Sequence, residues 1–166
     1  MENVTKIALL GLGTVGGGVY KVIRMQAEEM ERKLGTTVEI KKVLVRNIEK
    51  AKAKVEDASI LTNDIEEIIQ DHEIRIVVEV MGGIEPAKSY ILKALQAGKH
   101  VVTANKDLLA QEGHLLMDTA AENHCDLLYE AAVAGGIPII GPLKQSLTGN
   151  HITEVMGIVN GTTNFI

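Results

Sequence analysis

The sequence predicts an α/β fold: a doubly wound, mainly parallel β-sheet with helices on both faces. Short apolar runs alternate with helical patterns along its 166 residues, without repeats or low-complexity tracts. The runs are rich in Val, Ile and Leu and lack alternating polar residues, which is typical of strands buried on both faces. Sheets of this class bind ligands beyond the carboxyl ends of their strands. Polar residues that directly follow a strand are therefore the first candidates for a site.

The expected elements follow from the spacing of apolar residues. We expect strands at residues 7–10, 38–45, 60–62, 76–81, 100–103, 126–129 and 152–159. Apolar residues spaced by three and four predict one long helix from Val15 to Leu34, which Gly35 ends. Further helices are expected at 64–71, from Pro86 up to Gly98, at 105–123 and at 139–147.

Composition excludes several classes of function. The chain has 17 Lys and Arg against 22 Asp and Glu, and its net charge of −5 argues against a nucleic-acid or anionic-membrane surface. Its aromatic residues are only 3 Tyr and 1 Phe, too few for a platform that stacks single strands. A single cysteine, Cys125, fits a reducing compartment. Glycines from Gly11 onward interrupt the first apolar run, so we expect no signal peptide, no membrane span and a cytoplasmic protein.

A glycine-rich loop lies between the first strand and the first helix. It reads Gly11-Leu12-Gly13-Thr14-Val15-Gly16 and has the spacing of a dinucleotide-binding loop. Gly11 would allow a tight turn, Gly13 a close approach to a diphosphate, and Gly16 close packing of the helix on the strand. The alternative is a glycine-rich turn that binds nothing. The placement favours a Rossmann-type domain whose first helix points its N–H groups at the phosphates.

The residue after the second strand bears on the choice between NAD and NADP. NAD sites usually carry Asp or Glu there to accept a hydrogen bond from the ribose 2′-hydroxyl, whereas this strand runs into Arg46. A guanidinium suits a 2′-phosphate because it offers forked, permanently charged donors. The alternative is an ordinary surface arginine. NADP is favoured and NAD stays possible; Lys50, Lys52 and Lys54 are expected to form a solvated helix face.

Two later loops carry further candidates. Met81-Gly82-Gly83 follows the fourth strand, and its glycines would either let the backbone pass close to a cofactor or form a plain turn. In the loop after the fifth strand, Asn105 is placed to cap the next helix. The helix dipole disfavours a cation in the first turn, so Lys106 indicates a carboxylate, carbonyl or phosphate ligand. The alternative is a lysine that reaches into water.

Glu130 stands at the start of a small-residue turn, ahead of a helix expected near Pro138. Its carboxylate would either cap that helix or hold a hard cation together with backbone carbonyls, and the spacing favours the cap. Cys125 precedes its strand and therefore lies at the opposite end of the sheet, where we expect a structural role. The five histidines show no metal-like spacing, and His72, His100, His124 and His151, which fall at or before strand starts, are expected to belong to the scaffold.

Four motifs together resemble one family, homoserine dehydrogenase. They are Gly-Leu-Gly-Thr-Val-Gly-Gly-Gly-Val at 11–19, Thr-Ala-Asn-Lys at 103–106, Tyr-Glu-Ala-Ala-Val-Ala-Gly-Gly-Ile-Pro at 129–138 and Gly-Ile-Val-Asn-Gly-Thr-Thr-Asn-Phe-Ile at 157–166. The resemblance covers the whole chain, and the second and fourth motifs are more specific than the glycine loop. Homoserine dehydrogenases interconvert L-homoserine and L-aspartate 4-semialdehyde with NAD(P), on the route to threonine, methionine and isoleucine.

The resemblance implies a role for each matching residue at the cofactor. The backbone from Gly11 to Gly16 would hold the diphosphate, and Arg46 would hold the 2′-phosphate. Thr103 and Lys106 would contact the nicotinamide end. Lys106 would also lie near the substrate, as a supporting catalytic residue.

The resemblance also implies a monovalent cation site, usually occupied by sodium in the family. Glu130 and the backbone carbonyls of Val133, Gly135 and Ile137 are the matching residues. For Glu130, the resemblance therefore favours the cation over the helix cap.

The expected domain organisation follows from the same resemblance. Residues 1–150 would form the NAD(P)-binding Rossmann domain, and 151–166 a hinge, with Asn160-Gly161-Thr162 in it, and the start of a substrate and dimerisation domain. In the family, the principal catalytic lysine and the acidic substrate ligands lie beyond the position of Ile166. A β-rich run near the end of the chain would also leave an unpaired edge.

We therefore expect a fragment that binds NADP(H), is essentially inactive, and derives from a homo-oligomeric parent. A non-catalytic dinucleotide-sensing module is the alternative. A semialdehyde dehydrogenase that works through a thioester is disfavoured, because Cys125 lies at the wrong end of the sheet for a nucleophile.

Overall fold

A computed structural model describes residues 4–157. Its centre is a six-stranded sheet in which every neighbouring pair is parallel, in the order β3-β2-β1-β4-β5-β6. The strands are β1 (Val4–Leu10), β2 (Thr37–Leu44), β3 (Leu61–Thr62), β4 (Ile74–Glu79), β5 (His100–Thr103) and β6 (Leu127–Leu128). The chain starts in the middle of the sheet, winds outward to β3 and then crosses back to β4 beside β1. The predicted doubly wound α/β fold is confirmed, and its strand order reverses between β1 and β4.

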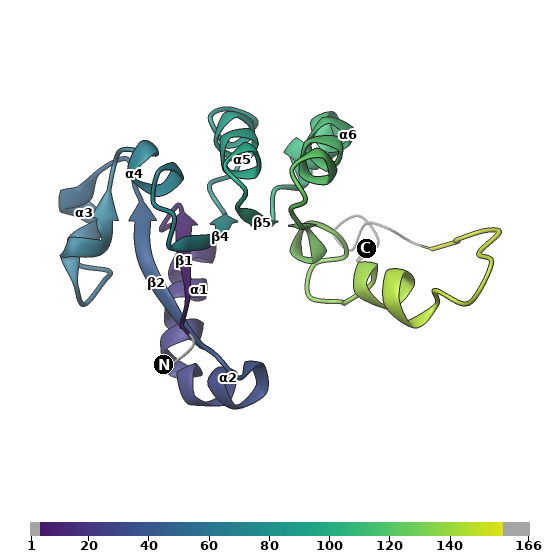
Figure 1. Cartoon of the computed structure of the whole chain (residues 1–166), viewed down its shortest axis with the longest axis horizontal. Helices are drawn as coiled ribbons and strands as arrows, with labels where there is room; N and C mark the ends of the chain where they lie inside the picture. The colour runs from purple at the N-terminus through teal and green to yellow at the C-terminus, as the bar shows by residue number, and fades with distance from the viewer. Residues whose placement is uncertain (1–3, 158–166) are drawn as a thin grey trace, which may run out of the picture.

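Helices connect the strands, as parallel neighbours require. They are α1 (Thr14–Met25), α2 (Ala27–Leu34), α3 (Ile48–Lys52), α4 (Glu66–Ile69), α5 (Ala87–Gln96) and α6 (Lys106–Glu122), with 3-10 helices η1 (Ala58–Ile60) and η2 (Glu130–Ala132) and a π-helical turn η3 (Pro142–Ser146). Figure 1 shows α5 and α6 side by side on one side of the sheet. The described helices include none that is both long and apolar enough to cross a membrane.

Successive residues of β1 point to opposite faces of the sheet, and each face packs into its own hydrophobic core. Ala8 and Leu10 belong to a core that includes residues of α5 and α6. Ile7 and Leu9 belong to a second core that includes Tyr20 of α1. All four of these β1 residues are at most 4% exposed, so β1 is held firmly and delivers the glycine loop to the carboxyl edge of the sheet.

The long helix predicted for residues 15–34 is wrong in one respect, because it is two helices that meet at Gln26. Gln26 has non-helical torsion angles, with φ −108° and ψ 17°. Its backbone still donates to the Val22 carbonyl (2.9 Å) and accepts from the Met30 N–H (2.8 Å). The apolar spacing therefore continues across the joint, which is why the pattern does not reveal it. Gly35 ends α2 with φ 68°, as predicted.

The strand predicted at 152–159 is wrong over residues 152–157, which form no strand, and residues 158–159 lie outside the described part. The apolar residues Ile152, Val155 and Met156 are exposed, and β6, the last strand of the sheet, has only two residues to pair with. Figure 1 shows this segment extending away from the sheet. The helix predicted at 139–147 is present mainly as the π-helical turn η3. The expected hinge residues Asn160-Gly161-Thr162 also lie outside the described residues.

Candidate functional site

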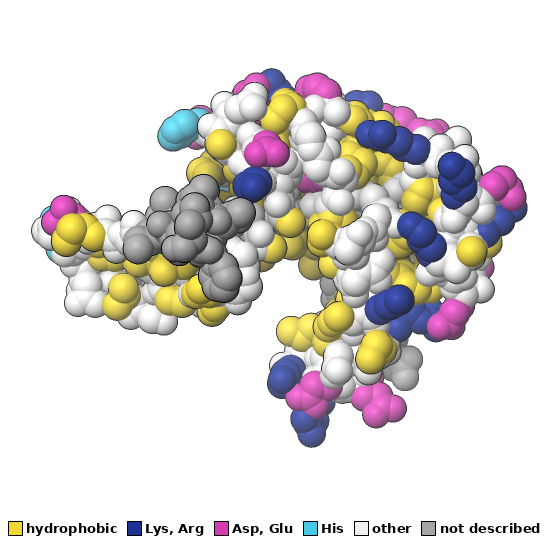
Figure 2. Space-filling model, turned by 180° about the vertical axis from the view of Figure 1, so that it is seen from behind, with side chains coloured by type: hydrophobic (Ala, Val, Ile, Leu, Met, Phe, Trp, Pro, Cys, Tyr) yellow, Lys and Arg dark blue, Asp and Glu magenta, His cyan; other side chains and the backbone are white. Residues whose placement is uncertain are grey.

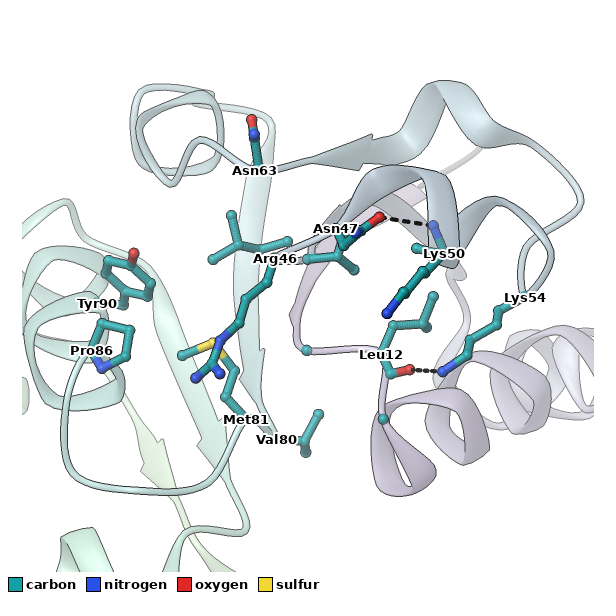
Figure 3. A pocket seen from close by; sticks show the side chains of 15 residues that line it. Leu12, Arg46, Asn47, Lys50, Lys54, Asn63, Val80, Met81, Pro86 and Tyr90 are labelled. Atoms are coloured by element: carbon teal, nitrogen blue, oxygen red, sulfur yellow. Dashed lines mark hydrogen bonds between the residues drawn. The ribbon is translucent and has the colours of Figure 1, made fainter.

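A cavity of about 580 Å³ opens at the carboxyl ends of β1, β2 and β4, where the strand order reverses. Its lining residues are Gly11, Leu12, Gly13, Leu44, Val45, Arg46, Asn47, Lys50, Ala51, Lys54, Asn63, Val80, Met81, Pro86 and Tyr90 (Figure 3). Three of them are basic and none is acidic. The cavity therefore lies where doubly wound sheets bind nucleotides, and its charge favours an anion.

The glycine loop has no spare room on its protein side. Gly11 has φ +102°, a conformation that favours glycine, and a Cβ there would lie 3.2 Å from the Val80 carbonyl oxygen. A Cβ on Gly16 would lie only 2.1 Å from the Gly11 carbonyl oxygen and 3.2 Å from Val80 Cγ2. The predicted roles of Gly11 in the turn and Gly16 in close helix–strand packing are therefore confirmed.

The same loop is open on its cavity side. A Cβ built on Gly13 meets no atom within 4 Å, although Gly13 lines the cavity. Gly13 is the N-cap of α1, where no side chain caps the helix and no acidic residue lies in the first turn. Thr14 and Val15 open the helix with exposed side chains, whereas the Leu12 side chain is buried. Within the described chain, the first N–H groups of α1 are thus free of a side-chain acceptor and fit an anion such as a diphosphate.

Basic side chains form the wall beyond β2. Arg46 directly follows Val45 at the end of β2, and Figure 3 shows its guanidinium extending into the cavity. Lys50, Lys52 and Lys54 are all exposed, as predicted, but Lys50 and Lys54 also line the cavity, and Lys54 Nζ donates to the Leu12 carbonyl (3.0 Å). Lys52 does not line the cavity and pairs with Glu49 (2.7 Å). Figure 2 shows basic side chains gathered on the side of the molecule that carries α3.

Thr103 and Lys106 lie at the neighbouring strand end, outside this cavity. Thr103 is the last residue of β5, and Lys106 is the first residue of α6 and exposed. The predicted cap is confirmed, because Asn105 Oδ1 accepts the Leu108 N–H (3.2 Å). Thr103 is only 1% exposed, so its hydroxyl faces the protein interior. The structure thus brings the glycine loop and Arg46 together and places Thr103 and Lys106 two strands away.

The sequence interpretation missed Glu79, the last residue of β4. Its side chain is completely buried, and it accepts hydrogen bonds from the Met81 N–H and the Thr103 hydroxyl, each at 2.7 Å. Met81 lies on the cavity wall, so Glu79 connects that wall to the end of β5. One signal was present in the sequence, because Glu79 is the only carboxylate within the apolar run 76–81.

Glu130 caps the turn that follows it. Its Oε1 accepts the N–H groups of Ile139 (2.6 Å) and Ile140 (2.8 Å), and its Oε2 accepts the N–H of Gly141 (2.7 Å). Hydrogen bonds from Ile139, Gly141 and Ile140 lower the pKa of the Glu130 carboxyl. The capping interpretation is confirmed. The described residues contain no group of three or more His, Cys, Asp or Glu that could hold a metal.

The oxygens expected to accompany Glu130 lie on the following loop. The carbonyls of Val133, Gly135 and Ile137 accept no hydrogen bond from any residue in 4–157. One carboxylate and three such carbonyls are the oxygen donors that a hard cation prefers. These residues therefore fit the implied cation in chemistry, and its binding stays a prediction.

Cys125 lies before β6, at the end of the sheet opposite the cavity, as predicted. Its Sγ is 3.7 Å from the Leu95 carbonyl oxygen, and burial raises the pKa of its thiol. A thiol held protonated is a poor nucleophile. His100 Nδ1 accepts the Asp126 N–H (3.0 Å), which supports the scaffold role expected for it.

A parallel sheet that reverses its strand order at a glycine loop defines the Rossmann class of dinucleotide-binding domains. Comparison with known families agrees: the family "Homoserine dehydrogenase, NAD binding domain" matches residues 11–130, and "Homoserine dehydrogenase" matches residues 138–166. The chain belongs to the homoserine dehydrogenase family.

Curated relatives and solved structures carry the same name. Homoserine dehydrogenase of Bacillus subtilis is 48% identical over 161 residues, and that of Lactococcus lactis is 50% identical over 163 residues. These matches cover 97% and 96% of this chain but only 37% and 38% of the relatives. The chain thus spans little more than a third of their length.

Two solved structures illustrate the match in three dimensions. A homoserine dehydrogenase from Thiobacillus denitrificans has a TM-score of 0.83 and 44% identity, covering 90% of this chain and 35% of the other. A hyperthermophilic archaeal homoserine dehydrogenase in complex with NADPH has a TM-score of 0.71 and 26% identity, covering 88% and 50%.

Proposed function

We propose that this chain is the nucleotide-binding part of a homoserine dehydrogenase and that it binds NADP(H). The cavity at the strand-order reversal carries this proposal, since it combines an open glycine loop with Arg46, Lys50 and Lys54. The NADPH complex of the archaeal structural neighbour supports it. In this proposal, the uncapped N–H groups of α1 receive the diphosphate.

Charge at the end of β2 favours NADP over NAD. Arg46 lies two residues past the end of this strand, and none of the described residues that line the cavity is a carboxylate that could accept a hydrogen bond from a ribose 2′-hydroxyl. Arg46 and Lys50 would hold the 2′-phosphate, the guanidinium through its fork and the ammonium as a point charge.

The proposed reaction interconverts L-homoserine and L-aspartate 4-semialdehyde. Bound NADP(H) supplies the hydride chemistry, and the protein orients the reactants and provides charge. Lys106 would act from the first turn of α6 on the carbonyl or carboxylate of the substrate, as a supporting catalytic residue beside the nicotinamide end. In the family, the main catalytic groups lie beyond the position of Ile166. We therefore propose that the isolated chain binds cofactor and turns over essentially no homoserine.

Isothermal titration of the chain with NADPH and NADH tests this proposal. NADPH should bind, and more tightly than NADH, because only NADPH carries the 2′-phosphate that Arg46 and Lys50 would hold. Equal affinities would contradict the NADP preference. Failure of both dinucleotides to bind would contradict the function itself.

The second proposed ligand is sodium, held by Glu130 and the carbonyls of Val133, Gly135 and Ile137. A cation that binds only the folded chain raises its thermal midpoint. The midpoint should therefore be higher in sodium chloride than in choline chloride of equal ionic strength, and Glu130→Gln should abolish the difference. Equal midpoints of the unchanged chain in both salts would contradict sodium binding.

A further inference from the structure

We propose that Glu79 is a positioning residue: it sets the nicotinamide half of the dinucleotide site by tying the loop after β4 to the start of α6. This inference rests on the proposed cofactor binding. Among residues 4–157, the Glu79 side chain forms no hydrogen bond or ion pair with the glycine loop or with Arg46, Lys50 or Lys54. It acts through Met81, which lines the cavity, and through Thr103.

The Glu79 carboxylate is held entirely by hydrogen-bond donors from two loops. Oε1 accepts the N–H groups of Met81 (2.7 Å) and Gly82 (3.3 Å), and Oε2 accepts the Thr103 hydroxyl (2.7 Å). No Lys, Arg or His of residues 4–157 forms an ion pair with Glu79. The buried oxygens therefore depend on these three donors for their stabilisation.

The hydrogen bonds continue from Thr103 and close into a ring. Thr103 Oγ1 accepts the Asn105 N–H (3.0 Å), and Asn105 Nδ2 donates to the Gly83 carbonyl (2.7 Å). Gly83 follows Gly82, which already donates to Glu79. Thr103 is 1% exposed and Asn105 is 5% exposed, so water does not compete freely for these bonds. The ring therefore links the loop 81–83 to the turn 103–105 rigidly.

The two segments that the ring joins follow the neighbouring strands β4 and β5 at the carboxyl edge of the sheet. Met81 borders the glycine loop, where the diphosphate would lie, since its Cγ is 3.1 Å from a Cβ built on Gly11, and Lys106 follows Asn105 directly. Gly82 and Gly83 have φ +75° and +76°, so this loop departs sharply from strand geometry and needs an external tie to hold one position. Both carboxylate oxygens of Glu79 form the hydrogen bonds that hold this loop in one position.

Packing alone does not account for a carboxylate at this position. An apolar side chain of similar size would fill the same space without the free-energy cost of burying a charge or a carboxyl group. It would leave the Met81 N–H and the Thr103 hydroxyl without an acceptor. The specific requirement is therefore for two acceptor oxygens, one toward each loop.

Glu79→Gln tests this requirement because the side chain keeps its size and loses one acceptor. The amide oxygen can keep the Met81 N–H, but the amide nitrogen then faces the Thr103 hydroxyl and can only donate to it, so the Thr103 hydroxyl hydrogen loses its acceptor. Titration calorimetry on the whole chain should compare NADPH with adenosine 2′,5′-bisphosphate, which carries the 2′-phosphate but no nicotinamide. We expect the Kd for NADPH to rise about tenfold, the factor that corresponds to about 1.4 kcal/mol, and the Kd for the bisphosphate to stay within twofold.

The matched control is Glu112→Gln, which makes the same chemical change in a bond between α5 and α6. Glu112 pairs with Lys88 (2.7 Å), outside the cavity and the ring. It should leave both affinities unchanged. A second variant, Asn105→Asp, keeps the acceptor that caps α6 but loses the donor to the Gly83 carbonyl, so it should reproduce the selective loss of NADPH affinity even if Glu79→Gln fails to fold.

The outcomes separate this inference from the proposed function. If the unchanged chain binds NADPH but Glu79→Gln and Asn105→Asp bind it equally well, the inference is wrong while the function stands. An equal loss of affinity for both ligands would mean general destabilisation and would also overturn it. If the unchanged chain binds no dinucleotide, the proposed function fails first.

Discussion

At the scale of single residues, the three motif glycines are needed for different physical reasons. Gly11 is required by its positive φ, and Gly16 by a neighbouring carbonyl that a Cβ would strike at 2.1 Å. Gly13 has neither constraint, because no atom of residues 4–157 lies within 4 Å of a Cβ built there. A ligand that approaches the backbone would explain a glycine at this position.

Gly13→Ala should therefore weaken NADPH binding without harming the fold. We expect a Kd at least about tenfold higher, equivalent to about 1.4 kcal/mol, with a free energy of unfolding lowered by no more than about 1 kcal/mol, because alanine is a poorer N-cap than glycine. Gly18→Ala is the control, since Gly18 lies in α1 and also has open space around it. It should leave binding unchanged and stabilise the chain by roughly 0.5–1 kcal/mol through helix propensity. Calorimetric titration measures the Kd for NADPH, and urea unfolding measures the free energy of unfolding. Equal Kd values for the two variants would contradict the role of Gly13.

Arg46 allows a second test at this scale. Arg46→Gln should raise the Kd for NADPH about tenfold or more, because a charged hydrogen bond to the 2′-phosphate is worth about 1.5–3 kcal/mol. The Kd for NADH should change little, since NADH has no such phosphate. Lys52→Gln is the control. Lys52 is a nearby basic residue of α3 that pairs with Glu49 and does not line the cavity. An equal effect of Arg46→Gln on the two dinucleotides would contradict the assignment.

At the scale of elements, the sequence predicts what depends on local pattern and misses what depends on distant partners. The strands 100–103 and 38–45 agree with β5 and β2 within one residue, because continuous apolar runs specify buried strands. The joint at Gln26 is invisible to the pattern, since helical spacing persists through it. The role of Glu79 could not be predicted for another reason. Its partner Thr103 is 24 residues away, and only the pairing of β4 with β5 brings the two side chains together.

The cap at Glu130 predicts a local response to pH. Backbone hydrogen bonds lower the pKa of this carboxyl in the folded chain, so its stabilising effect is present above the ordinary Glu pKa of about 4.5. That stabilisation is lost as the pH falls through the lowered pKa. Amide hydrogen exchange at Ile139, Ile140 and Gly141 should therefore accelerate in acid relative to β1 amides, once corrected for the intrinsic pH dependence of exchange.

Glu130→Gln should accelerate exchange of the same three amides already at neutral pH, because an amide side chain offers only one acceptor oxygen. Glu154→Gln is the control, since Glu154 lies exposed at the far end of this segment. Unchanged protection of Ile139, Ile140 and Gly141 in Glu130→Gln would show that the cap does not hold this turn.

At the scale of the whole molecule, the fold class and the location of the site could both be predicted, because a parallel sheet gathers its strand ends at one edge. The composition of that site could not. Lys50 and Lys54 are exposed, as a solvated face predicts, but both also line the cavity, and Lys54 donates to the carbonyl of Leu12, which lies 42 residues earlier in the chain. Local sequence gives no signal of that contact.

We propose that catalysis requires a full-length chain, because this chain spans only 37% of its Bacillus subtilis relative. In such a full-length protein, Lys106→Ala should lower kcat/KM for homoserine about a hundredfold if Lys106 stabilises developing charge on the substrate. Lys88→Ala, which breaks an ion pair with Glu112, serves as the control. Unchanged activity of Lys106→Ala would favour the alternative of a module that only senses dinucleotide.

A structure of this chain, determined from a crystal grown with NADPH, tests the binding position of the cofactor most directly. We predict the diphosphate over the backbone of Gly11–Gly16, at the N-terminus of α1, with the 2′-phosphate beside Arg46. A structure in which this loop stays empty while the dinucleotide occupies another part of the surface would contradict that prediction.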